Sequence, residues 1–308
     1  MKAAMIQRNG GPEVFVYGDV PDPTADPGGV VVDIHAASVN AADWKVRSDE
    51  YGGADLSFPY VLGRDFSGVV RTVGEGVKDI TVGDAVFGVC DVGQEGAYAE
   101  QISIKASIIA PKPDTLSHMA ASALALTGLT ATVSLEDTLR LQPGETIFIQ
   151  GGAGGVAGFA IQLAKHLGAR VITTASSPNH DYLRELGADE IIDYNTQDFT
   201  EMVSNCDAVL DTVGNNVAMM SFQVLRPGGR AAFIASGASA PTPQRDDVQS
   251  LRPNVTRDRP HLQRILELVA LGVIKIPPIK EYPLSEAAAA HHISERRHLK
   301  GKLVFKVR

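Results

Sequence analysis

Short apolar runs separated by turn residues fill roughly the first hundred residues of the chain. The runs cover residues 30–34, 68–73, 85–89 and 98–104, and prolines and glycines lie between them. Because short β-prone runs bounded by turn residues are typical of strands, this part is predicted to form a compact β-rich domain.

The pattern changes near Ser117. Residues 117–135 are rich in alanine and leucine and contain no proline, which predicts a helix with Ser117 at its N-cap. From residue 146 onward, β-prone and helical segments alternate, with strands expected at 146–150, 170–174, 190–192, 208–210 and 231–235 and helices at 156–167 and 181–186. Such alternation predicts a parallel sheet with helices on both faces.

The remaining quarter of the chain departs from this alternation. Residues 236–259 are polar and aperiodic, so we expect a loop there. A helix is expected over 260–271, and a second helix (285–293) and a strand (302–307) follow. Because these last two elements do not continue the alternating pattern, the tail is expected to return to the first domain.

A glycine-rich stretch from Gly151 to Gly158 lies between a predicted strand and a predicted helix. Glycines in this context allow a tight turn and let backbone amides approach a pyrophosphate, whose charge the helix N-terminus stabilises. The alternative is that these glycines only let the helix pack on the strand. The context favours a dinucleotide site, and the residues expected to contact the cofactor are Gly152, Gly154, Gly155 and Val156.

The end of the second strand of this unit indicates which dinucleotide binds. NAD sites usually carry an acidic residue there, which holds the ribose 2′-hydroxyl. Here Thr174 is followed by Ala175, Ser176 and Ser177, with His180 close behind. Ser176 and Ser177 could equally form an ordinary turn, but small hydroxyls and a histidine suit a 2′-phosphate, so we predict that NADPH binds at least tenfold more tightly than NADH.

Composition excludes several other classes of protein. The net charge is -8 and the pI about 5.5, which disfavours nucleic-acid or anionic-membrane partners. The two cysteines, Cys90 and Cys206, are too far apart for a metal knuckle. We find neither a signal peptide nor an uninterrupted apolar stretch of about 20 residues, so we expect a cytoplasmic protein without a membrane segment.

Several further stretches span nearly the whole chain: residues 36–43, 62–68, 82–87, 126–131, 186–189, 211–214 and 301–305. Together, and in this order, they resemble the zinc-independent quinone oxidoreductase branch of the medium-chain dehydrogenase/reductase superfamily. The resemblance implies an α/β protein in which both chain ends form a GroES-like β-rich catalytic domain (1–120 and 273–308). A Rossmann domain that binds NADPH (121–272) is inserted between them, and the family implies a homodimer.

The zinc-dependent relatives differ from this chain at their metal ligands. The first ligand position carries Asn40, and the Gly-His-Glu stretch reads Gly63-Arg64-Asp65. Without a zinc ion to polarise an alcohol, hydride addition to a conjugated carbonyl is the better match, because conjugation spreads the developing charge. We therefore expect NADPH-dependent reduction of a quinone or another α,β-unsaturated carbonyl.

The resemblance also assigns roles to single residues. Asn40, Asp43 and Thr127 are the candidate catalytic residues, with Asn40 donating a hydrogen bond to the substrate oxygen and Thr127 facing the nicotinamide. Further cofactor contacts are expected from Tyr194, Thr212 and Val213. Local turn or helix chemistry is the alternative for Asn40, Asp43 and Thr127.

Two other functions stay open from the sequence. One is a medium-chain enoyl-thioester reductase, and the other is a non-catalytic NADPH-binding module that regulates a partner. Three histidines near the carboxyl end, His291, His292 and His298, lack partners at metal-ligand spacing, so we expect them at the surface.

Overall fold

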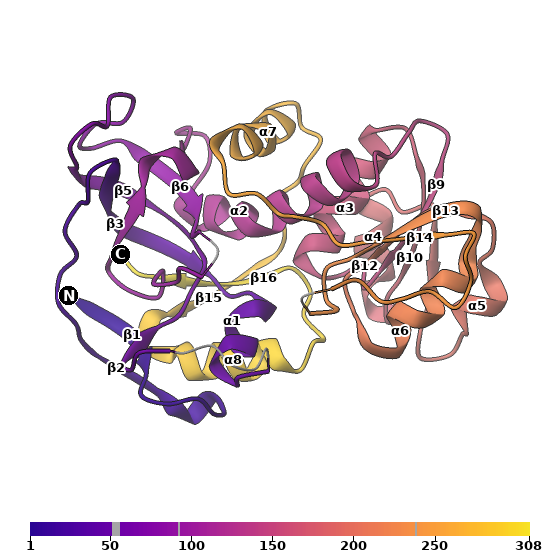
Figure 1. Ribbon diagram of the computed structural model, residues 1–308, viewed down its shortest axis with the longest axis horizontal. Coiled ribbons are helices and arrows are strands. Elements are labelled where there is room, and N and C mark those ends of the chain that lie inside the picture. Colours follow the sequence, from indigo (N-terminus) through magenta and orange to yellow (C-terminus); the bar gives the residue numbers. More distant parts are fainter. Residues whose placement is uncertain (51–55, 92, 238) are drawn as a thin grey trace. The chain divides into compact units, whose positions relative to one another are not determined.

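The computed structural model describes residues 1–50, 56–91, 93–237 and 239–308. The chain forms two compact units (Figure 1). The first comprises residues 1–126, 257–264 and 276–308, and the second comprises residues 127–256 and 265–275. Both ends of the chain therefore belong to the first unit.

The first unit is built on a seven-stranded sheet, as far as the described residues show. Its order is β15 (Ile279–Pro283), β16 (Lys302–Lys306), β3 (Gly29–Ser38), β5 (Asp65–Val73), β6 (Ala85–Val89) and β8 (Ile109–Pro111), and β7 (Gln101–Lys105) also pairs with β3. The last strand, β16, runs antiparallel to β3, with Val304 opposite Ser38 (Figure 1). The prediction that the tail returns to the first part of the chain is confirmed.

A smaller sheet and several helices complete the first unit. The sheet has the order β2 (Phe15–Asp19), β1 (Lys2–Ile6) and β4 (Tyr60–Val61). The helices include α1 (Ala41–Arg47), the first part of α2 (His118–Thr132), residues 259–264 at the start of α7 (Arg259–Ala270) and α8 (Ala287–Glu295), and α8 packs against α1. The core between these elements contains Val32, Ile34 and Phe66 from β3 and β5, all fully buried.

The second unit is a parallel six-stranded sheet within the described residues. The order is β11 (Glu190–Ile192), β10 (Arg170–Thr174), β9 (Thr146–Gln150), β12 (Cys206–Asp211), β13 (Leu225–Phe233) and β14 (Gln249–Leu251). In chain order this is 3-2-1-4-5-6, the arrangement of dinucleotide-binding Rossmann sheets. The predicted α/β fold class is confirmed, and the sheet order reverses between β9 and β12.

The elements around this sheet match the sequence predictions unevenly. Helices α3 (Gly155–His166), α4 (His180–Glu185) and α7 (Arg259–Ala270) lie within a residue or so of their predicted bounds, whereas α5 (Phe199–Met202) and α6 (Asn215–Met220) were not predicted. The expected loop over 236–259 is wrong in part, because residues 249–251 form β14 beside β13. Three residues are too few to leave a periodic signal in the sequence.

The long helical segment that follows Ser117 is α2, continued by a π-helical stretch, η3 (Val133–Thr138). The Ser117 hydroxyl accepts a hydrogen bond from the Ala120 amide at 3.1 Å, so the predicted N-cap is confirmed. Residues 118–138 are long and apolar enough to cross a membrane, which the sequence analysis did not anticipate. However, 83% of the apolar window is buried inside the protein, as in the core helix of a globular domain.

Candidate functional site

The glycine-rich turn joins β9 to α3 in the second unit. Gly151 has a φ of +76°, which favours glycine, and Gly154 is the N-cap of α3. A Cβ on Gly152 would lie 2.4 Å from the Thr173 hydroxyl oxygen, so any side chain here would displace β10. A Cβ on Gly154 would lie no closer than 3.4 Å to a neighbouring atom, so this glycine leaves a small open cradle at the start of the helix.

The ends of three strands are tied together next to this turn. The Thr174 hydroxyl donates to Gln150 Oε1 at 2.7 Å, and the Thr212 hydroxyl donates to the Gln150 carbonyl at 2.8 Å. Asp211 accepts hydrogen bonds from the Val213 and Gly214 amides at about 3 Å, which fixes the turn after β12. The carboxyl ends of β9, β10 and β12 thus form one cross-linked edge, where open α/β sheets bind their ligands.

These observations fit a bound dinucleotide. The open cradle at Gly154 precedes a 12-residue helix, and Gly155 and Val156 in its first turn are only half-buried. Amide groups at such a terminus suit a pyrophosphate. Thr127, which is also predicted to contact the cofactor, is 4% exposed in α2.

The remaining predicted cofactor residues gather at the ends of β10 and β11. The Asn179 amide donates to the Ser176 hydroxyl at 3.1 Å, and His180 Nε2 lies 3.2 Å from the Ala175 carbonyl. The Ser177 amide donates to Asp193 Oδ2 at 3.2 Å, and Tyr194 beside it is 45% exposed. The structure therefore brings these residues together and adds a carboxylate, Asp193, that the sequence analysis did not consider.

Asn40 lies at the centre of a buried polar cluster in the first unit. It follows β3 and caps α1, where its backbone N–H donates to Asp43 Oδ2 at 2.8 Å. Lys302 of β16 donates from Nζ to Asn40 Oδ1 at 2.7 Å and to the Val39 carbonyl at 2.8 Å. On its other side, Asn40 Nδ2 donates to Asp65 Oδ1 at 3.0 Å. Asn40 thus bridges a buried cation and a buried anion.

The charges at the two ends of this bridge support each other. Burial raises the pKa of the Asp65 carboxyl and lowers the pKa of the Lys302 ammonium, and each charge partly offsets the effect of burial on the other. Lysine can only donate and a carboxylate can only accept, so these partners fix the orientation of the Asn40 amide. Asp65 also accepts from the Ser38 amide and hydroxyl at 2.8–3.2 Å.

This geometry bears on the predicted role of Asn40 as a hydrogen-bond donor. One amide hydrogen is used by Asp65, and the second points to the Ser38 carbonyl at 3.3 Å, longer than an ordinary N–H···O bond. The second hydrogen is therefore the one that a substrate oxygen could capture. The donor role stays a prediction, restricted to that hydrogen.

Asp43 is fully buried and belongs to a second, adjoining cluster. Its Oδ2 accepts from the Tyr98 hydroxyl at 2.7 Å, and its Oδ1 lies 3.6 Å from Arg64 Nε. Burial raises the pKa of Asp43 to about 6, against the influence of Arg64. Arg64 also donates to Glu95 Oε1 at 2.9 Å, and the Glu95 side chain is only 3% exposed. Two buried carboxyl groups therefore share one guanidinium.

The prediction that His291 is a surface residue is wrong. Its side chain is fully buried and continues the Asp43 cluster, because α8 packs against α1. Arg47 Nη1 lies 3.0 Å from His291 Nδ1, and His291 Nε2 lies 3.2 Å from the Tyr98 hydroxyl. Since arginine only donates, Nδ1 is the acceptor and Nε2–H donates to Tyr98, which donates to Asp43. Burial lowers the pKa of His291 to about 3, so the ring is neutral.

Sequence reasoning assigned no role to Lys302, Asp65, Glu95, Tyr98 or His291. Lys302 lies 262 positions from its partner Asn40, and His291 lies 193 positions from Tyr98, so only the fold brings these residues together. One signal was present for Lys302, which directly precedes the apolar residues Leu303–Phe305. A lysine whose side chain is buried beside such residues needs a partner.

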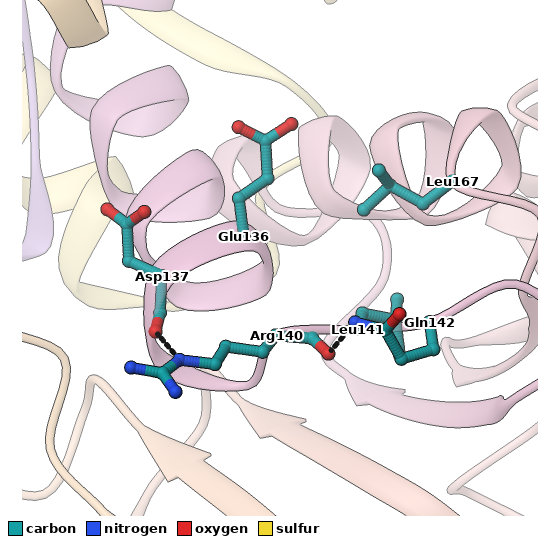
Figure 2. Close-up of a pocket in the computed structure, with 6 residues that line it drawn as sticks. All are labelled: Glu136, Asp137, Arg140, Leu141, Gln142 and Leu167. Carbon is teal, nitrogen blue, oxygen red and sulfur yellow. Dashed lines mark hydrogen bonds between the residues drawn. The ribbon is translucent and has the colours of Figure 1, made fainter.

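A surface hollow of about 590 Å³ lies elsewhere in the second unit (Figure 2). It is lined by Glu136, Asp137, Arg140, Leu141, Gln142 and Leu167. The Asp137 carbonyl accepts a 3.4 Å hydrogen bond from Arg140 Nε (Figure 2). The Arg140 and Gln142 side chains bond to their own loop, and the residues predicted for the cofactor site lie outside this hollow.

A double-mutant cycle tests the Lys302–Asn40–Asp65 bridge. We expect Lys302→Met to lower the free energy of unfolding by about 3–5 kcal/mol, because it leaves Asp65 buried without a countercharge. In Lys302→Met/Asp65→Asn the loss should be smaller than the sum of the single losses by about 1 kcal/mol or more. Chemical denaturation gives the free energy of unfolding of wild type, Lys302→Met, Asp65→Asn and the double variant. Strictly additive losses would show that the two charges do not interact.

The buried carboxyl pair predicts a pH dependence of stability. Burial raises the pKa of Glu95 from 4.5 to about 8, with the Asp43 charge acting in the same direction and Arg64 opposing it. Between these two pH values the folded protein holds a proton that the unfolded chain has lost, so stability falls as pH rises from about 4.5 to 8 and the loss is complete above 8. Glu95→Gln carries no such proton and should escape this loss.

The measurement is the melting temperature of both proteins from pH 5 to 9. The melting temperature of Glu95→Gln should rise relative to that of wild type as the pH increases to about 8, and the difference should then stay constant. Asp43, Tyr60, Cys90, Tyr98 and Arg64 face the same cluster and are unchanged in the variant. Glu75→Gln, which removes an exposed carboxylate of the same unit, is the control. A pH-independent difference would contradict the proton held by Glu95.

Comparison with known proteins agrees with both halves of the structure. Residues 26–114 match the alcohol dehydrogenase GroES-like domain, and residues 186–305 match the zinc-binding dehydrogenase model. The 2-haloacrylate reductase of Burkholderia sp is 32% identical over 98% of this chain and 98% of its own length.

Solved structures show the same likeness. The quinone oxidoreductase of Coxiella burnetii has a TM-score of 0.92 and 34% identity, covering 100% of this chain and 99% of that one. The Escherichia coli quinone oxidoreductase complexed with NADPH has a TM-score of 0.92 and 28% identity over the full length of both chains. The chain therefore belongs to the quinone oxidoreductase branch of the medium-chain dehydrogenase/reductase superfamily.

Proposed function

We propose that this protein is an NADPH-dependent reductase that delivers hydride to a quinone or another α,β-unsaturated carbonyl. The observation that carries the proposal is the Asn40 bridge, in which a buried lysine holds the amide oxygen and one amide hydrogen is only weakly bonded. Relatives support the substrate class, because they include a 2-haloacrylate reductase and an NADPH-dependent alkenal/one oxidoreductase of Arabidopsis thaliana.

NADPH supplies the hydride, and the second unit holds the cofactor. We assign the pyrophosphate to the turn formed by Gly152, Gly154, Gly155 and Val156. The adenosine ribose is assigned to the corner formed by Ser176, Ser177, His180 and Tyr194. Thr127, Thr212 and Val213 are assigned to the nicotinamide half. This scheme makes residues 121–272 the cofactor-binding part and residues 1–120 with 273–308 the catalytic part.

The substrate oxygen gains negative charge as the conjugated carbon accepts hydride. In our proposal Asn40 donates its second amide hydrogen to this oxygen, while the Lys302 ammonium on the amide oxygen makes the Asn40 N–H groups stronger donors. The bond to the Ser38 carbonyl is given up in exchange. Asp65 keeps the other hydrogen and prevents the amide from turning.

Completion of the reduction also requires a proton. Asp43 accepts from the Asn40 backbone, and it shares Arg64 with Glu95, whose pKa is raised to about 8. The pair therefore retains a proton at neutral pH. We propose that Glu95, which holds this proton, supplies it to the reduced substrate by way of Asp43.

The reaction is proposed to be independent of zinc. Asn40, at the first ligand position of the zinc-dependent relatives, is held by Lys302 and Asp65, and Arg64 of the Gly63–Asp65 stretch is held by Glu95. A cation bound beside Lys302 and Arg64 would meet two positive charges. Among the described residues there is no group of three or more histidine, cysteine, aspartate or glutamate side chains that could hold a metal ion.

Assembly and location follow the family in this proposal. We propose a cytoplasmic homodimer formed through the edges of the second-unit sheets, where β14 is the edge strand next to β13. The acidic net charge supports a small-molecule substrate rather than a nucleic acid or a membrane surface.

The proposed reaction is tested by following NADPH oxidation with quinones, enones and enoyl thioesters. We expect turnover with the quinones and enones, unchanged after exhaustive dialysis against a chelator. Preference for enoyl thioesters would favour the alternative reductase, and nucleotide binding without turnover would favour a regulatory module. Activity lost with the chelator and restored by zinc would contradict the zinc-independent mechanism.

The donor role of Asn40 is tested by Asn40→Ala. If the amide acts mainly in the transition state, kcat should fall by about one to three orders of magnitude while NADPH affinity changes little. Ser38→Ala is the matched control, because it loosens Asp65 but keeps the Asn40 amide. Equal losses of kcat in the two variants would indicate that loosened packing, and not a lost donor, explains the effect.

A further inference from the structure

The corner at the ends of β10 and β11 contains a carboxylate that sequence spacing did not reveal. β10 and β11 are parallel neighbours, so their carboxyl ends lie at the same edge of the sheet. The Ala175 amide donates to the Ile192 carbonyl at 3.0 Å, and two residues further on the Ser177 amide donates to Asp193 Oδ2 at 3.2 Å. Asp193 therefore lies directly beside the residues that follow β10.

Asp193 is ionised and held in place by neighbouring donors. Its Oδ1 accepts from the Asn195 backbone and side-chain amides, both at 3.0 Å. These bonds, together with those from Ser177, lower the pKa of Asp193 below its ordinary value of 3.8. Its carboxylate is exposed, so it is fixed in position and open to a ligand.

The other groups of this corner offer little extra positive charge. The Ser176 hydroxyl accepts from Asn179, and His180 Nε2 faces the Ala175 carbonyl. The guanidinium of Arg184, in α4, is paired with Asp181 at 2.6 Å. The Asp193 carboxylate therefore gives this corner a negative charge.

A carboxylate at this position discriminates between the two dinucleotides. In Rossmann sites the acidic residue at the end of the second strand accepts a hydrogen bond from the ribose 2′-hydroxyl of NADH and repels the 2′-phosphate of NADPH. That residue is missing after Thr174, but Asp193 from the third strand reaches the same turn.

We propose that Asp193 is a specificity-determining residue of the cofactor site, which accepts the ribose 2′-hydroxyl of NADH and weakens the binding of NADPH. The protein therefore also binds NADH, and its preference for NADPH is smaller than the tenfold margin predicted from the sequence. This inference rests on the proposed function, because it requires that the adenosine ribose lie at this corner.

The test is fluorescence titration of wild type and Asp193→Asn with NADPH and NADH. Asparagine keeps an oxygen for the Ser177 and Asn195 amides, so the turn should persist. We expect NADPH to bind about three- to tenfold more tightly to the variant, because the negative charge that would repel the 2′-phosphate is removed. NADH should bind equally or up to about threefold more weakly, and the gain for NADPH should shrink in 0.5 M salt.

Asp246→Asn is the charge-matched control. It removes an exposed carboxylate that precedes β14, at the opposite edge of the same sheet, and should leave both affinities unchanged. Melting temperatures are measured alongside, and Asp193→Ser replaces Asp193→Asn if that variant does not fold.

Two results would overturn this inference and leave the proposed function standing. In the first, the ratio of the NADPH and NADH dissociation constants in the Asp193 variant stays within twofold of the wild-type ratio. In the second, the wild-type protein prefers NADPH by tenfold or more. A wild-type protein that binds neither nucleotide would instead overturn the proposed function. Binding of both nucleotides with a ratio that moves only in the Asp193 variant supports the two together.

Discussion

The buried bridge from Lys302 through Asn40 to Asp65 is the constraint on which the first unit depends. Two opposite charges lie in the protein interior, where neither tolerates the loss of its partner. The amide between them satisfies both, with its oxygen on the cation and its N–H on the anion. This requirement fixes the positions of β16, which carries Lys302, and β5, which carries Asp65, relative to the start of α1, where Asn40 follows β3.

The same bridge connects stability with chemistry. A side chain whose orientation is set by a lysine on one side and a carboxylate on the other is already arranged for an incoming oxygen, so little reorganisation is needed when charge develops there. The adjoining Asp43 cluster adds groups that titrate near neutral pH. The buried polar groups of the Asn40 bridge and the Asp43 cluster lose their hydration when the core forms. The proposed reaction uses these same groups.

Sequence patterns predicted the local features of this protein better than its long-range contacts. The alternation after residue 146 predicted β9 and β10 to the residue, because each strand is a short run of β-prone residues between turns. Short elements such as α1, α5 and β14 left no periodic signal. For the candidate site, the glycine turn was visible in one stretch of sequence, whereas Asp193 and Lys302 act on residues 16 and 262 positions away. Charges that meet only through sheet pairing cannot be read from spacing along the chain.

The pairing of β16 with β3 also determines the order in which the two units can fold during translation. All residues of the second unit, 127–256 and 265–275, are synthesised before Lys302 emerges, so that unit can fold while the chain is still growing. Until then Asp65 and Asn40 lack the ammonium group that completes their cluster. The first unit therefore cannot complete its large sheet until β16 has been translated, some 260 residues after its partner β3. Until then the edge of β3 that pairs with β16 is open, and the Asp65 carboxylate has no countercharge from Lys302.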